Sequence, residues 1–146
     1  MKWIILPLLM GIIIISGCIG GDTTGNVVSG QSESGVMEIP VSEISSQAKF
    51  YSYESGGKKI NFFVVKGSDG EVRTAFDACD ICGGKKGYRQ QRNDMTCVNC
   101  GRHFNIDDIG SKNQGGGCWP SYLSHRIEDG NIIIEKNELA AGGWRF

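Results

Sequence analysis

The chain has 146 residues, and its 15 Lys and Arg against 16 Asp and Glu give a formal net charge of −1. This balance excludes the strong positive field that proteins use to bind nucleic acid, so we expect no nucleic-acid partner. The length allows one compact domain plus a leader, and 22 Gly against 3 Pro indicate tight turns rather than a proline-rich stalk.

Residues 1–18 have the plan of a secretory leader, with Lys2 before an apolar stretch and small residues before Cys18. This exit resembles a lipobox, which predicts lipidation on Cys18, although an uncleaved membrane helix is the alternative. Either reading places the remainder on the extracytoplasmic face of the cell membrane. Residues 19–35 are polar and Gly-rich and are expected to act as a flexible tether before a domain at 36–146.

The domain is predicted to be a small, all-β, antiparallel fold. Short alternating or aromatic-rich segments predict strands, two of which flank a turn at residues 67–70 and two of which flank Asp129-Gly130. No helical stripe is evident. The predicted strands lie at residues 37–41, 50–53, 59–65, 71–76, 123–128 and 131–135.

Two Cys-x-x-Cys-Gly segments lie between the two predicted hairpins. Two cysteines three residues apart can place both sulfur atoms on one ion, and a following Gly permits the backbone conformation that closes such a loop. The pattern therefore predicts a four-thiolate metal site suited to zinc or iron. Its ligands would be Cys79, Cys82, Cys97 and Cys100.

Three other interpretations of these cysteines are possible. A thioredoxin-like dithiol needs a βαβ context, which is missing, and c-type haem attachment needs a His after the second cysteine. Disulfides across the two loops are permitted outside the cytoplasm and stay open as an alternative.

Two further residues near the pairs could contribute. Cys118, in a glycine-rich loop, is a possible additional ligand, a second-shell thiol, a free thiol or a packing residue. His103 could complete a Cys₃His site, but it is more readily interpreted as a residue that faces solvent or contacts the ligands from outside. A small basic group at Lys85, Lys86, Arg89 and Arg92 is either a solvated loop or a surface for an acidic redox partner.

The order of elements resembles a Rieske domain in which cysteines replace the histidines and the first loop is one residue longer. A closer resemblance is to the FtrD-like family of membrane iron–sulfur proteins, over roughly residues 38–135. It implies an iron–sulfur protein at the membrane and, in several relatives, a link to iron uptake. The segments that carry the resemblance are Phe76-Asp77-Ala78-Cys79, Cys82, Gly87-Tyr88, Cys97-Val98-Asn99-Cys100, Phe104 and Gly116-Gly117-Cys118-Trp119-Pro120.

The resemblance favours a [2Fe–2S] cluster over zinc or a single iron. The function expected from it is one-electron transfer to or from a membrane redox or iron-transport partner, rather than stand-alone enzymatic activity. The alternative function is a zinc-stabilised binding or metal-delivery module displayed on the membrane, without redox activity.

Overall fold

The computed structural model describes residues 35–83 and 86–146. The expectations for the leader, the tether and Cys18 fall on residues 1–34, and Lys85 also lies outside the described residues. Within the described ranges, no helix is both long enough and apolar enough to cross a membrane.

A four-stranded antiparallel sheet forms the centre of the domain, in the order β2-β3-β4-β8. Its central strand β3 has a nearly unbroken apolar sequence because both of its faces are buried. Ile60 and Phe62 lie in one hydrophobic core, whereas Phe63 and Val65 lie in the other. The four strands are β2 (Lys49–Ser55), β3 (Lys58–Lys66), β4 (Val72–Cys79) and β8 (Pro120–Tyr122).

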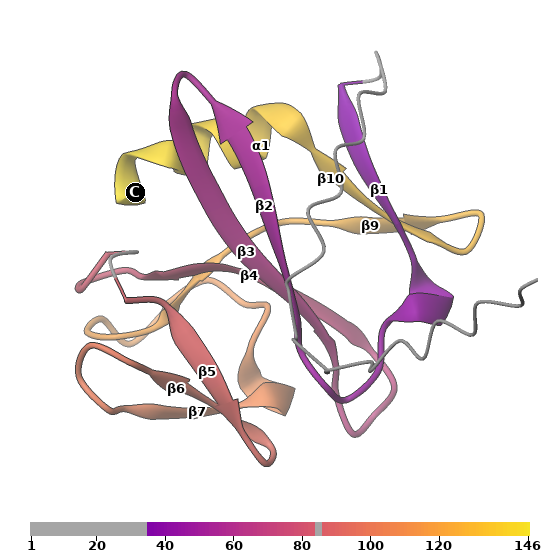
Figure 1. Ribbon diagram of the computed structural model, residues 1–146. Coiled ribbons are helices and arrows are strands. Elements are labelled where there is room, and N and C mark those ends of the chain that lie inside the picture. Colours follow the sequence, from indigo (N-terminus) through magenta and orange to yellow (C-terminus); the bar gives the residue numbers. More distant parts are fainter. Residues whose placement is uncertain (1–34, 84–85) are drawn as a thin grey trace, which may run out of the picture.

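A three-stranded sheet and the C-terminal segment cover the first face of the central sheet. Its order is β1-β10-β9, with β1 (Val36–Pro40), β9 (Arg126–Glu128) and β10 (Asn131–Glu135). Ile132, Ile134 and Leu139 contribute to this core. The short helix α1 (Lys136–Ala141) and the 3₁₀ turn η3 (Gly142–Arg145) follow β10, and the helical segment that they form passes behind β2 and β3 to the C-terminus in Figure 1.

A third sheet, in the order β5-β6-β7, covers the opposite face and lies at the lower left in Figure 1. It consists of β5 (Tyr88–Gln91), β6 (Asp94–Cys97) and β7 (His103–Asn105). Tyr88, Met95 and Phe104 from these strands pack against Phe63 in the second core. Two further 3₁₀ turns, η1 (Val41–Glu43) and η2 (Ile106–Asp108), join the sheets.

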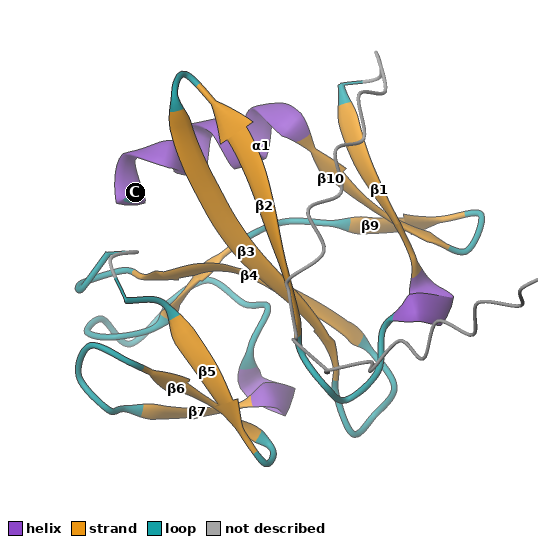
Figure 2. Ribbon diagram, viewed as in Figure 1, coloured by secondary structure: helices purple, strands orange, loops and turns teal. Residues whose placement is uncertain are grey.

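The all-β, antiparallel prediction is confirmed, and both predicted hairpins form. β3 pairs with β4, and β9 pairs with β10 across Asp129 and Gly130, which both have positive φ. Figure 2 shows that strands dominate and that helical segments are short.

Three details differ from the prediction, in addition to the short strand β8, which was not expected. The helix α1 was not expected, because six residues are too few to give a helical stripe. The sheet β5–β7 lies where only a spacer was expected. The strand predicted at residues 123–128 is confined to Arg126–Glu128, because the Leu123 side chain is buried and its carbonyl accepts a hydrogen bond from Thr74 Oγ1 at 2.7 Å.

Candidate metal centre

The first cysteine loop begins where β4 ends. Cys79 is the last residue of this strand, and Gly83 closes the loop through two backbone hydrogen bonds with it, of 2.9 and 3.2 Å. Gly83 has φ of +68°, a left-handed conformation that a side chain would strain. This closed turn brings Cys82 back beside Cys79.

The second loop is built in the same way. Cys97 ends β6, and the N–H of Gly101, whose φ is +76°, donates to the Cys97 carbonyl at 2.8 Å. The N–H of Cys97 donates in turn to the carbonyl of Arg102 at 2.9 Å. Each loop therefore places its first cysteine at a buried strand end and its second cysteine on an outer turn.

A third loop carries Cys118 to the same place. Cys79 on β4 pairs with Pro120 on β8, and the N–H of Asp80 donates to the Trp119 carbonyl at 3.0 Å. The Trp119 indole packs edge-on against Phe104, with 5.6 Å between ring centroids. The three loops lie together at the left edge of Figure 2.

The three loops gather five sulfur atoms, all from cysteines that form no disulfide. Cys79, Cys82 and Cys97 form one group whose sulfur atoms lie within 4.8 Å of one another. Cys82, Cys100 and Cys118 form a second group by the same measure. Cys79 and Cys97 are buried and are called the inner thiols below. The outer thiols are Cys82, Cys100 and Cys118, which are partly or fully exposed.

Backbone N–H groups surround the sulfur atoms and favour thiolates. Burial raises the pKa of Cys79, but hydrogen bonds from three backbone N–H groups outweigh it and lower this pKa to about 7. The N–H of Arg102 and then the thiol of Cys97 lower the pKa of Cys100. Burial raises the pKa of Cys97, and it raises that of Cys118 to about 12. The N–H donors to Cys79 come from Cys82, Ile81 and Trp119.

Two further polar residues lie on or next to the strands that carry the inner thiols: the half-buried Asp77, two residues before Cys79 on β4, and the buried Tyr88, which pairs with Cys97. Asp77 accepts a hydrogen bond from the N–H of Tyr88 at 2.6 Å, and burial raises its pKa to about 6. The hydroxyl of Tyr88 is buried and has no hydrogen-bond partner among the described residues. Burial and then the charge of Cys79 raise the pKa of Tyr88. Neither Asp77 nor Tyr88 had been assigned a role from the sequence, although both fall in segments that carry the family resemblance.

The structure separates His103 from the cysteine groups. His103 lies on the exposed side of β7, where its Nδ1 is 3.1 Å from Thr96 Oγ1 and 3.6 Å from Asp94 Oδ2. Of the basic residues singled out from the sequence and described in the structure, Lys86, Arg89 and Arg92 are exposed.

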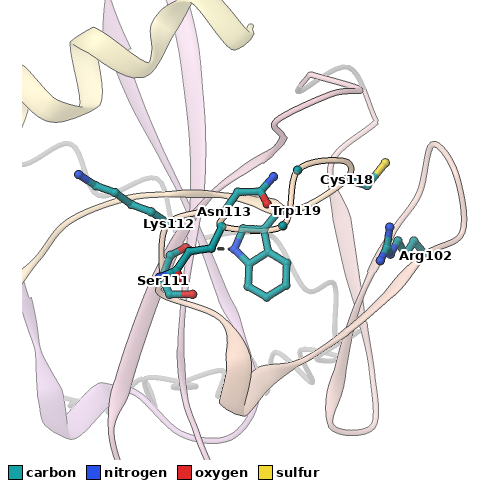
Figure 3. A pocket seen from close by; sticks show the side chains of 9 residues that line it. Arg102, Ser111, Lys112, Asn113, Cys118 and Trp119 are labelled. Atoms are coloured by element: carbon teal, nitrogen blue, oxygen red, sulfur yellow. Dashed lines mark hydrogen bonds between the residues drawn. The ribbon is translucent and has the colours of Figure 1, made fainter.

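A shallow pocket of about 350 Å³ opens beside Cys118. Figure 3 shows the Trp119 indole in the middle, with its Nε1 donating to the carbonyl of Ser111 at 3.0 Å. Cys118 and Arg102 lie on the right of the indole, where the Cys118 sulfur points away from it, and Lys112 extends to the left (Figure 3). Of the five cysteines, Cys118 lines this pocket.

The donor set fits a thiolate-bound metal or iron–sulfur centre. Five thiols converge, and backbone N–H groups offset the negative charge that thiolate ligands carry. The buried Tyr88 hydroxyl, which lacks a partner of its own, adds a further donor beside the inner thiols.

A family model described as "Membrane iron-sulfur containing protein FtrD-like" matches residues 44–146. The chain belongs to the FtrD-like family. The matched range contains all three cysteine loops, so both cysteine groups lie within the family's shared region. No curated protein matches the chain.

Membership in the FtrD-like family makes this a membrane-associated protein of the iron–sulfur class. The cysteine groups supply the thiols that such a centre needs.

Proposed function

We propose that this FtrD-like domain is a one-electron carrier, tethered to the extracytoplasmic face of the membrane, with a [2Fe–2S] centre held by the two Cys-x-x-Cys pairs. The observation that carries the proposal is the pairing of inner and outer thiols. Each loop supplies one buried cysteine and one outward cysteine, Cys79 with Cys82 and Cys97 with Cys100. When bound, such a centre supplies reversible one-electron transfer.

The spacing of the thiols supports a shared thiolate-bound metal centre. Four thiolates on one tetrahedral ion, with metal–sulfur bonds of about 2.3 Å, lie about 3.8 Å from one another. Here the sulfur atoms divide into two overlapping groups that share Cys82. Within each group the sulfur atoms lie within 4.8 Å of one another, close to the spacing of thiolates that share a metal. The inner-and-outer arrangement also resembles that of a Rieske domain, with Cys82 and Cys100 in the positions of the histidines.

The outer side of the site supports exchange of electrons with a partner. Cys100 is exposed, and apolar side chains on both loops face solvent beside it, with Ile81 67% and Val98 41% exposed. Apolar residues around an exposed ligand favour a short contact with a partner protein and shorten the distance for electron transfer. A membrane redox protein, including one that handles iron, is the class of partner that we propose. The tether is provided by the lipid on Cys18 or by an N-terminal helix.

Four thiolates predict a low reduction potential. Replacing the two histidines of a Rieske centre with thiolates adds negative charge, which disfavours the reduced state and moves the potential toward about −400 mV. The proposed carrier is therefore a low-potential one.

The test is metal, sulfide and spectroscopic analysis of the full chain purified without oxygen. We expect two irons and two sulfides per chain, visible absorption that bleaches with dithionite, and a redox titration with a midpoint near the low value given above. A colourless protein with one zinc per chain would refute the carrier and establish the second candidate, a zinc-stabilised binding module, which the Cys-x-x-Cys-Gly loops also suit.

A further inference from the structure

The outer side of the centre holds more thiols than it needs. If the inner thiols fill two of four ligand positions, two positions remain for three outer thiols, Cys82, Cys100 and Cys118. The inference drawn from this surplus rests on the proposed function, because it assumes a four-thiolate centre.

The sulfur of Cys118 lies as far from the sulfur atoms of Cys82 and Cys100 as two ligands of one metal ion lie from each other. Its sulfur is 3.9 Å from that of Cys82 and 3.8 Å from that of Cys100. Two thiolates bound to one tetrahedral metal, with bonds of about 2.3 Å, are separated by about 3.8 Å. Cys118 could therefore share a metal with either neighbour without a rearrangement of the loops.

The position of Cys118 is fixed by the residues that follow it. The carbonyl of Trp119 is held by the N–H of Asp80 at 3.0 Å, its indole donates to Ser111, and Pro120 pairs with Cys79 in the central sheet. The preceding Gly116 and Gly117 have positive φ, of +68° and +79°, which turns the chain toward the other loops. The backbone thus holds Cys118 at the centre rather than leaving it on a free loop.

Cys100 is the outer thiol with the greatest exposure, whereas Cys82 and Cys118 are partly buried. An exposed ligand is the first to be lost when a thiol-reactive compound reaches the site. A third outer thiol at ligand spacing would then retain the centre.

We propose that Cys118 is an alternative ligand at the outer side of the centre, which replaces Cys100 or Cys82 when either is lost. The inner thiol Cys97 shares no group with Cys118 and has no such replacement. The four-cysteine motif is therefore backed by a fifth thiol from a distant part of the chain.

The experiment compares iron and sulfide content, visible absorption and electron paramagnetic resonance of full-length variants purified without oxygen. The set is Cys97→Ala, Cys100→Ala, Cys118→Ala and the double variant of Cys100 and Cys118. We expect Cys100→Ala to retain most of its iron with a shifted spectrum, and Cys118→Ala to resemble the wild type. The double variant should lose iron to the level of Cys97→Ala.

Two results would overturn the proposal. Loss of iron in Cys100→Ala as complete as in Cys97→Ala would show that Cys118 does not replace it. Loss of iron in the single variant Cys118→Ala would show that Cys118 is an obligatory ligand rather than an alternative one. Circular dichroism checks that each variant is folded, and serine variants repeat the series where an alanine variant is not. If the wild type holds zinc instead of iron, the proposed electron-transfer function is refuted. The zinc content of the same variants still tests whether Cys118 replaces a lost outer ligand.

Discussion

At the scale of single residues, the hydroxyl of Tyr88 is a buried donor beside the inner thiols. It has no hydrogen-bond partner among the described residues, and burial followed by the charge of Cys79 raises its pKa, so the proton is retained. Buried hydroxyls without a partner are rare in proteins. The acceptor available to the Tyr88 hydroxyl is a cysteine sulfur, which gains negative charge when the proposed centre is reduced.

Replacing Tyr88 with Phe should therefore lower the reduction potential. A hydrogen bond worth about 0.5–1.5 kcal/mol corresponds to roughly 20–65 mV for one electron, and its loss disfavours the more negative, reduced state. Redox titration of Tyr88→Phe against the wild type measures the shift. Tyr51→Phe is the matched control, because the Tyr51 hydroxyl is also buried without a partner but lies in the other core. An equal shift in both variants, or none in Tyr88→Phe, would contradict this role.

At the scale of elements, the two cysteine loops are the same turn made twice. Each begins at a strand end and closes through a glycine with positive φ, Gly83 in one and Gly101 in the other. A Cβ added to Gly101 would meet nothing within 4 Å, so its requirement for glycine is one of backbone conformation alone. The turn therefore depends on glycine without depending on packing.

Gly101→Ala should destabilise the loop by about 1–2 kcal/mol, the cost of a left-handed conformation for a residue with a side chain. Urea unfolding of the loaded protein measures this, and iron content should fall because the closed loop places Cys97 beside Cys100. Gly115→Ala serves as the control, since Gly115 also has free space but lacks a positive φ. It should be neutral or stabilising by about 0.4–1 kcal/mol. Equal behaviour of the two variants would exclude a conformational role for Gly101.

At the scale of the whole molecule, β3 separates two hydrophobic cores. Phe62 and Phe63 are adjacent and fully buried, but Phe62 packs with β1, β10 and α1, whereas Phe63 packs with the sheet that carries the second cysteine loop. Phe63 contacts Tyr88 at 6.0 Å between ring centroids, and Tyr88 contacts Phe104 at the same distance. The second core therefore supports the cysteine loops, since it contains Cys79 and Cys97.

The matched pair Phe62→Leu and Phe63→Leu tests this division. Each should lower the free energy of unfolding by an amount on the order of 1 kcal/mol, since each removes similar buried volume. Only Phe63→Leu should speed the loss of iron to a chelator, because only its core supports the cysteine loops. The rate of bleaching of visible absorption with excess chelator measures this. Equal bleaching rates in the two variants would show that both cores support the cysteine loops to the same extent.

Short-range features of the fold and site were predictable because their causes are local. Runs of β-forming residues located the strands β3 and β10, alternation located β4, and the Asp129-Gly130 pair located a hairpin, since all of these reflect local backbone preferences. The sheet β5–β7 was missed because its strands have only three or four residues, too few to show a period.

The sequence by itself determined the all-β class, the two Cys-x-x-Cys-Gly loops and the family to which the chain belongs, because these depend on residue type and short spacing. Only the tertiary structure decided which thiols are inner and which are outer, and that Cys118 joins them. The pairing of β4 with β8 brings together residues about forty positions apart, such as Cys79 and Pro120. Spacing along the chain cannot reveal such a contact, because it depends on how the sheets pack.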